Sequence, residues 1–427
     1  MRDTLLPFSP PAIGDEEIVE VAAALRSGWI TTGPRTGLFE RRFAEFTGAD
    51  AALALNSGTG AMHVALAALG VGKALNVGKA FDVGKTSVVI TTPLTFCSGV
   101  HVIEQMGARP VLVDVDPETL NIDPAQVDRA ARSLRSGERL AAIMPVHLYG
   151  HPCDRTSLIE IARSHGGAKH GCALVEDAAH AFPARYEGKM IGAGGDAGVT
   201  VLTAFSFYAT KNLTTGEGGM LTGPPESIAE ARLWSLHGID GDSWTRDQSR
   251  QPAPYEARWF YEVTRPGFKY NMSDIQAAIG IVQLSKAADC AIRRAEIAAR
   301  YNEAFELLEE LRIPARRSSI EHAWHIYALR LNLDKLKISR DEFIEHLRRR
   351  NIAASVHFIP IHLHPYYRDS YGYKPNDFPV AYREYQRLVS LPIYPTMRDE
   401  DVSDVIEAVG AIITENRKAA HFAAAEA

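Results

Sequence analysis

A lysine and an aspartate, each close behind a short apolar run, have the clearest chemical potential in this chain. Lys211 lies in SFYATKNLTTGEGGM, residues 206–220, and Asp177 lies in VEDAAHA, residues 175–181. An amine flanked by small and polar residues near the end of a strand is placed to form a Schiff base. A carboxylate at the end of an earlier strand is placed to hold a pyridinium nitrogen. The pair predicts pyridoxal phosphate (PLP) chemistry, with Lys211 as covalent anchor and Asp177 as ring partner. The alternatives are a surface lysine and a helix-capping aspartate.

Residues near these two suit the ring of the cofactor. Ala178 and Ala179 follow Asp177 and leave room for a flat ring, and His180 is expected near the ring or its phenolic oxygen. Phe96 follows another apolar run and is a candidate for stacking on the ring face. A structural histidine and a core phenylalanine are the competing interpretations.

A phosphate group requires backbone N–H groups and hydroxyls at the start of a helix. The run Ser57-Gly58-Thr59-Gly60 precedes an apolar, helix-like stretch and supplies both. Ser206 adds a further candidate hydroxyl. The competing interpretation of Ser57 is a plain helix cap.

Elements that position these residues follow from alternating helical and strand-like patterns. Helices are expected at Asp15–Ser27 and Gly60–Leu69. The expected strands are Val88–Thr92, Pro110–Val115, Ala141–Val146, Ala173–Glu176 and Val199–Ser206. This order predicts an α/β fold with a mainly parallel sheet and helices on both faces. Ligands of such sheets bind at the carboxyl ends of strands, where Asp177, Ser206 and Lys211 fall.

The C-terminal part is expected to form a smaller α+β domain. Its expected elements are a long helix at Ser273–Leu311, strands near His325–Leu331 and Ala354–Phe358, and helices at Arg340–Arg350 and Glu400–Ile413. We place the large domain at residues 1–285 and the small domain at 286–427. The irregular segment 240–268 is interpreted as a functional loop, and the Val-Gly-Lys repeat at 71–87 as an expanded surface loop.

Bulk composition narrows the class of protein. The chain has 427 residues and a net charge of −6, with no basic tail, so a nucleic-acid partner is not expected. Four scattered cysteines without a CxxC pair argue against a disulfide framework and a zinc knuckle. No continuous apolar stretch reaches the ~20 residues of a membrane span. We expect a cytoplasmic protein without a membrane partner.

Two other chemistries are considered and disfavoured. Gly84-Lys85-Thr86-Ser87 imitates a P-loop, but its spacing from Gly78 is wrong and it precedes a strand rather than a helix. Several C-terminal histidines lack a recognised ligand spacing with carboxylates, so no metal site is expected. These histidines are His322, His325, His357, His362 and His364.

The motifs together resemble the DegT-type family of PLP-dependent sugar aminotransferases, over about residues 8–415. The matching blocks are GWITTGP, NSGTGAMH, TTPLTF, VEDAAHA, SFYATKNLTTGEGG, PGFKYNMSDIQAAIG and SLPIYP. The resemblance implies the aspartate aminotransferase-like fold (PLP fold type I, with a seven-stranded sheet) and a homodimer with active sites at its interface. It marks Lys211 and Asp177 in the roles given above and places Gly58, Thr59 and Ser206 at the phosphate. Either Lys269 or Asn271 is expected to reach the cofactor of the partner subunit.

Within that family, the chain most resembles enzymes that aminate C-4 of a UDP-linked 4-keto sugar. The resemblance therefore implies transfer of an amino group from L-glutamate to a nucleotide-linked keto sugar, for amino-sugar or surface polysaccharide biosynthesis. A sugar dehydratase of the same family is one alternative, although those enzymes carry histidine where this chain has Lys211. A non-catalytic PLP-binding or sugar-binding regulator is the other.

Overall fold

A seven-stranded sheet forms the centre of the larger part of the protein. The computed structural model describes residues 2–72, 85–165, 171–195, 198–240 and 261–418. The strands of the sheet are β1 (Ala51–Leu55), β2 (Thr86–Thr91), β3 (Arg109–Leu112), β4 (Glu138–Ile143), β5 (Ala173–Asp177), β8 (Val201–Ser206) and β9 (Gly219–Gly223). Their order is β1-β9-β8-β5-β4-β2-β3. The five strands from β8 to β3 pair in parallel, while β9 pairs antiparallel to both β8 and β1. The predicted mainly parallel sheet is confirmed.

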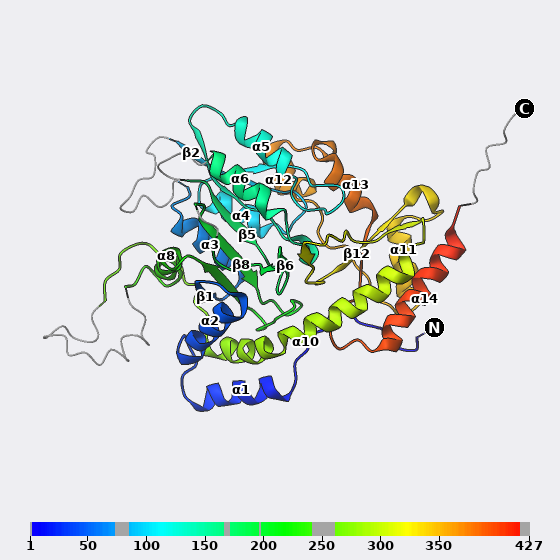
Figure 1. Ribbon diagram of the computed structural model, residues 1–427, viewed down its shortest axis with the longest axis horizontal. Helices are drawn as coiled ribbons and strands as arrows, with labels where there is room; N and C mark the ends of the chain where they lie inside the picture. Colours follow the sequence, from blue (N-terminus) through cyan, green and yellow to red (C-terminus); the bar gives the residue numbers. More distant parts are fainter. Residues whose placement is uncertain (1, 73–84, 166–170, 196–197, 241–260, 419–427) are drawn as a thin grey trace, which may run out of the picture.

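Helices cover both faces of this sheet (Figure 1). They are α1 (Asp15–Arg26), α2 (Pro34–Thr47), α3 (Gly58–Ala68), α4 (Ser98–Gln105), α5 (Pro124–Arg132), α6 (Arg155–His165), α8 (Pro225–Ser235) and α10 (Asp274–Phe305). Alternate strand residues point to opposite faces. Val89 therefore packs in the cluster formed with α3, α4 and α8, whereas Val88 and Ile90 pack with α5 and α6. Helices α2 and α10 cover the β1 and β9 end of that second face.

The long helix α10 joins the two parts of the molecule. The side chain of its N-cap Ser273 accepts a hydrogen bond from the Gln276 backbone N–H, and the Gln276 side-chain oxygen accepts one from the Ser273 backbone N–H. This capping box fixes where the helix starts. Among the described helices it is the one long and apolar enough to cross a membrane. It packs against α1, α2 and α14 (Asp399–Asn416), and these contacts bury part of its apolar surface inside the fold.

The smaller, C-terminal part is built on a three-stranded sheet in the order β10-β12-β13. Its strands are β10 (Leu311–Arg312), β12 (Tyr327–Leu331) and β13 (Leu388–Leu391), and its other helices are α11 (Arg340–Arg349), α12 (Pro365–Tyr371) and α13 (Pro379–Arg387). A third sheet joins β6 (Arg185–Tyr186), β7 (Lys189–Met190) and β11 (Ile320–Glu321). The division at residues 285 and 286 falls within α10 and stays a prediction.

The strand expected at Ala354–Phe358 was wrong. Only Ser355 forms a β-bridge in this stretch, to Ser390 in β13. Phe358 has a φ of 66°, which is incompatible with a continuing strand. The segment instead turns away from the sheet and contributes to the cavity described below.

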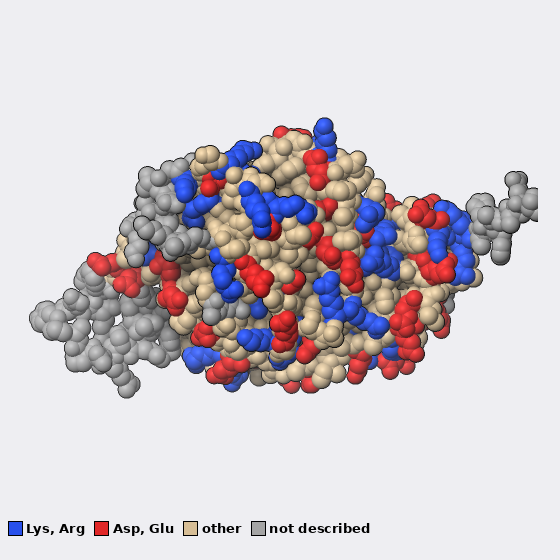
Figure 2. Space-filling view, turned by 45° about the horizontal axis from the view of Figure 1, so that its top comes forward, with Lys and Arg blue, Asp and Glu red and all other residues tan. Residues whose placement is uncertain are grey.

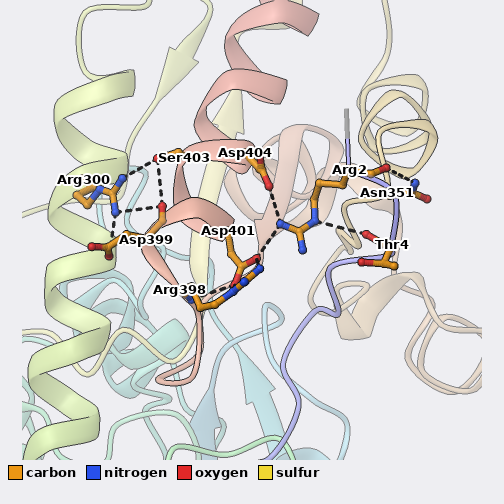
Figure 3. A network of polar contacts seen from close by, with 9 residues as sticks. All are labelled: Arg2, Thr4, Arg300, Asn351, Arg398, Asp399, Asp401, Ser403 and Asp404. Carbon is orange, nitrogen blue, oxygen red and sulfur yellow. Dashed lines mark hydrogen bonds and ion pairs between the residues drawn. The ribbon is translucent and has the colours of Figure 1, made fainter.

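The N-terminal segment is tied to the C-terminal part (Figure 3). Arg2 donates to Asp401 at 2.7 Å and to Asp404 at 2.6 Å. Asn351 donates to the Arg2 carbonyl oxygen at 2.7 Å, and Leu6 forms a bridge with Ile352. The first residues therefore pack on the C-terminal part of the chain.

Asp401 is expected to make stability depend on pH. Burial raises the pKa of this carboxyl, but hydrogen bonds from Arg398 and Arg2 outweigh it and lower the pKa to about 2. The depressed pKa stabilises the fold above the unfolded value near 3.9, by about 2 kcal/mol, and this stabilisation is lost as pH falls from about 4 towards 2. Chemical denaturation of Asp401→Asn should therefore show a smaller loss of unfolding free energy over that range. Asp404→Asn is the control, and an equal effect there would contradict the assignment.

Charged side chains are interspersed on the face shown in Figure 2, where Lys and Arg lie among Asp and Glu.

The repeat at 71–87 and the loop at 240–268 lie largely outside the described residues. The proposed roles of both segments stay predictions.

Candidate active site

The carboxyl ends of β5 and β8 bring the predicted residues to one edge of the sheet. Asp177 pairs with Ala204, and the N–H of Ala178 donates to the carbonyl of Ala204 at 2.8 Å. A cavity of about 420 Å³ opens there. It is lined by eight of the predicted site residues, Ser57, Gly58, Thr59, Phe96, Asp177, His180, Ser206 and Lys211. The rule that ligands bind beyond the carboxyl ends of parallel strands accounts for this location.

Lys211 reaches the cavity from the turn that follows β8. Its backbone N–H donates to the carbonyl of Tyr208 at 2.9 Å. Burial lowers the pKa of the amine to about 8, although the nearby Asp177 carboxylate raises it. A substantial fraction of Lys211 is therefore neutral at mildly alkaline pH, as both a nucleophile and a base require.

Asp177 is a buried carboxylate at the cavity wall. Its Oδ1 accepts the N–H of Ala179 at 3.0 Å. Burial raises its pKa, while the Ala179 N–H and Lys211 lower it in part. A positively charged group in the cavity would relieve the remaining cost of burying this charge.

The neighbouring Glu176 points to the other face of the strand and performs a structural task. It accepts hydrogen bonds from Arg155 at 2.6 Å and from Thr203 at 2.7 Å. Burial raises its pKa, but Arg155 and His147 outweigh burial and hold the pKa well below its usual range. The network fixes β5 behind Asp177.

The start of α3 lines the cavity with Ser57, Gly58 and Thr59. The Ser57 side chain accepts the N–H of Gly60 at 3.0 Å, so the helix cap expected as its alternative role is present. A Cβ on Gly58 would lie 2.9 Å from the Cβ of Ser206 and 3.2 Å from the carbonyl oxygen of Phe205. Only glycine lets the helix start approach the end of β8 this closely. The free N–H groups and hydroxyls there suit an anion.

Gly58→Ala is expected to weaken PLP binding roughly tenfold or more. The added methyl group must push α3 from β8, and overpacking of this kind costs about 1–3 kcal/mol. A fluorescence titration of cofactor-free protein with PLP measures the change. Gly410→Ala is the matched control, since its added Cβ meets nothing within 4 Å. Equal PLP affinity in the Gly58 variant and the wild type would contradict this use of the helix start.

His180 and Phe96 line the cavity from two different segments of the chain. His180 is buried, accepts the N–H of Tyr149 through Nδ1 at 3.2 Å, and stacks on Phe358 with ring centroids 5.5 Å apart. Phe96 is 57% exposed, so it is not a core residue. Its ring lies near that of Phe358, with the ring centroids 6.0 Å apart. His357 and Phe358 also line the cavity and were not predicted as site residues. No pattern in the chain marked them for this site, because they lie in an irregular segment of the C-terminal part.

Lys269 and Asn271 do not line this cavity within the described chain. Lys269 donates to the Asn271 side-chain oxygen, and Asn271 donates to Thr32 at 2.6 Å. Their predicted contact with a partner subunit's cofactor stays a prediction.

The cavity residues fit PLP in each of its parts. An amine of lowered pKa, a buried carboxylate lacking a cationic partner of its own at hydrogen-bonding distance among the described residues, and a helix start without side-chain bulk meet in one space. Lys211 would hold the aldehyde, Asp177 the ring nitrogen and the α3 start the phosphate.

Comparison with known proteins settles the family. The model of the DegT/DnrJ/EryC1/StrS aminotransferase family matches residues 11–410. The chain belongs to this family. It is 48% identical over 418 residues to the uncharacterized protein MJ1066 of Methanocaldococcus jannaschii, covering 98% of this chain and 100% of that protein. It is 45% identical over 414 residues to the spore coat polysaccharide biosynthesis protein SpsC of Bacillus subtilis, covering 96% and 98%.

Solved structures agree with this membership. The putative sugar aminotransferase Spr1654 from Streptococcus pneumoniae, in its PMP form, superimposes with a TM-score of 0.82 at 30% identity, covering 96% of this chain and 99% of that chain. A PLP form of the same protein matches with a TM-score of 0.81. The DegT-family prediction, the enzyme class and the cofactor are therefore confirmed: the chain is a PLP-dependent sugar aminotransferase.

Proposed function

We propose that the protein transfers the amino group of L-glutamate to C-4 of a UDP-linked 4-keto sugar in the cytoplasm. The observation that carries the aminotransferase chemistry is Lys211, whose amine has a pKa of about 8 and faces Asp177 in the cavity. The printed role of SpsC supports a product used in polysaccharide biosynthesis. The motif resemblance described above supports the sugar, its nucleotide and the carbon aminated.

Asp177 and Lys211 have separate roles in this chemistry. PLP, when bound, supplies a ring that withdraws electrons from the substrate carbon. Asp177 keeps a proton on the ring nitrogen by presenting a buried anion to it. Lys211 Nζ would move a proton between the substrate carbon and the carbon of PLP that carried the aldehyde, since a pKa of about 8 lets the amine both accept and give up a proton near neutral pH. Both half-reactions of a transamination use the same amine in this way.

Both substrates carry more negative charge than this cavity alone balances. Among the described residues that line it, Lys211 is the only lysine or arginine. Glutamate has two carboxylates, and a nucleotide sugar has a diphosphate. We therefore propose that further anion-binding groups come from a partner subunit of a homodimer, either the Lys269 cation or the neutral Asn271 amide crossing the interface.

Mixed dimers test the shared site. Subunits carrying Lys211→Ala and subunits carrying Lys269→Ala should each be inactive alone. Random pairing makes half the dimers mixed, each with one intact site, so about a quarter of wild-type activity should return. The same pairing with Asn271→Ala decides between the two residues. Full activity in both the Lys269 and Asn271 variants would contradict the interface role.

A substrate panel tests the reaction itself. The purified enzyme is supplied with L-glutamate and UDP-, GDP- or dTDP-linked 4-keto and 3-keto sugars, and products are identified by mass spectrometry. We expect 2-oxoglutarate and a 4-amino sugar, with the UDP substrate preferred. A deoxygenated sugar in place of an amino sugar would favour the dehydratase alternative. Tight sugar binding without turnover on any substrate would favour the regulator.

A further inference from the structure

A half-buried asparagine has an orientation fixed by its hydrogen-bond partners. Asn212, next to Lys211, donates its side-chain N–H groups to the carbonyl oxygens of Phe182 at 2.9 Å and Ala323 at 2.8 Å. A carbonyl accepts and never donates, so the amide nitrogen must face these two groups. The side-chain oxygen of Asn212 is left as an acceptor.

That oxygen fixes the tautomer of His325. The Oδ1 of Asn212 lies 3.1 Å from His325 Nδ1, so Nδ1 carries the proton. Burial, with His180 and Lys211 nearby, lowers the pKa of His325 well below its usual value and keeps the ring neutral. Its Nε2 is then a lone pair, and this atom is fully buried without a hydrogen-bond partner among the described residues.

The His180 ring lies next to that of His325. Its Nδ1 accepts the Tyr149 N–H, so its Nε2 carries the proton of the neutral ring. The His180 and His325 ring centroids are 4.5 Å apart, and one nitrogen of each lies within 4.8 Å of the other and of one in His357. A lone pair on His325 favours a neighbouring N–H and disfavours a second lone pair.

We propose that Asn212 and His325 are positioning residues that, together with the Tyr149 N–H, favour the Nε2–H tautomer of His180. His180 then offers an N–H donor, and neither a lone pair nor a positive charge, to the phenolic oxygen of PLP in the cavity. Lys211 and His357, the other titratable groups whose charges act on His180, oppose a positive charge on it. This inference rests on the PLP site and is independent of the sugar, nucleotide and amino donor proposed above.

Nitrogen NMR of cofactor-free protein tests the tautomers directly. Long-range ¹H–¹⁵N spectra of ¹⁵N-histidine protein should show Nε2–H for His180 and Nδ1–H for His325. The His180→Asn and His325→Gln variants identify the two signals by their loss. In Asn212→Ala, His325 should lose its preference for Nδ1–H. A wild-type His180 in the Nδ1–H form, or a His325 in the Nε2–H form, would overturn the proposal.

The spectrum of bound PLP tests the consequence. A hydrogen-bond donor to the phenolic oxygen of PLP stabilises the negative charge of that oxygen. The oxygen then holds less tightly the proton on the Lys211 nitrogen that is bonded to PLP. Without that donor, the pH midpoint of the visible absorbance change should rise by about one unit, the loss expected for a hydrogen bond to a charged oxygen. We expect part of this shift in Asn212→Ala and in His325→Leu, since the Tyr149 N–H still faces His180 Nδ1 in both variants. His325→Gln should restore much of it, since glutamine places an acceptor where Nε2 was.

Asn121 provides the matched control. It is buried, also donates to two carbonyls, those of His151 and Pro152, and accepts the Leu148 N–H at 2.9 Å. Its amide lies beside the His151 ring, and neither Asn121 nor His151 lines the cavity. Asn121→Ala should lower stability and leave the midpoint unchanged. An equal shift in this control, or no shift in His325→Leu, would contradict the positioning role. Inactivity towards every sugar would leave both readouts unaffected and would count only against the proposed substrate.

Discussion

Lys211→Ala is expected to lower kcat by at least about 10³-fold and to abolish the absorbance of covalently held PLP. The substitution removes the amine that anchors the cofactor and also the base that moves the proton, and a positioned base alone contributes about 10²–10⁴-fold. The fold should persist, because the Lys211 side chain serves the cavity rather than a core cluster. Steady-state kinetics and absorbance spectra of protein reconstituted with PLP measure both effects.

Lys211→Arg separates charge from proton transfer. It keeps a cation near Asp177, but a guanidinium does not deprotonate at ordinary pH. We expect it to be as inactive as the alanine variant. Small primary amines added to Lys211→Ala should restore part of the activity, since they replace the missing base. Wild-type turnover in either variant would remove Lys211 from its central role.

The parallel core of the sheet could be predicted because its strands carry runs of buried apolar residues. The strands β2, β4, β5 and β8 lie within about three residues of the predicted ranges. The segment pattern missed β1, AALAL, and β9, GMLTG. Alanine and glycine have low strand propensity, so these two segments are strands through their antiparallel pairing with each other and with β8. Only the family resemblance implied seven strands.

The candidate site was predictable where strand ends determine position. Asp177 and Ser206 end adjacent parallel strands, so chain order alone places them at one edge. His357 and Phe358 were not predictable in this way, since their segment has strand-like composition and yet bends at a positive φ. The Asn212–His325 contact depends on the direction of two side chains more than a hundred positions apart, which no periodicity in a single sequence records.

Asp177→Asn is expected to lower kcat by roughly 10²–10³-fold, the loss typical of removing one preorganised charge from an active site. Asparagine keeps the size of the side chain but cannot hold a proton on the ring nitrogen by charge. Asp177 also raises the pKa of Lys211, so the variant should lower that pKa further below about 8. The pH dependence of the rate of PLP attachment reports this change, with its midpoint moving to lower pH.

Glu176→Gln is the control that separates the site from the strand that carries it. Glu176 adjoins Asp177 in sequence but pairs with Arg155 on the other face of β5. Losing this buried charge partner costs about 3–5 kcal/mol of stability, so melting should occur at lower temperature. The spectrum of bound PLP should stay unchanged because the Glu176 side chain does not line the cavity. The assignment of the ring partner to Asp177 would have to be abandoned if Asp177→Asn kept wild-type kcat. It would also have to be abandoned if Glu176→Gln lowered kcat as much as Asp177→Asn does.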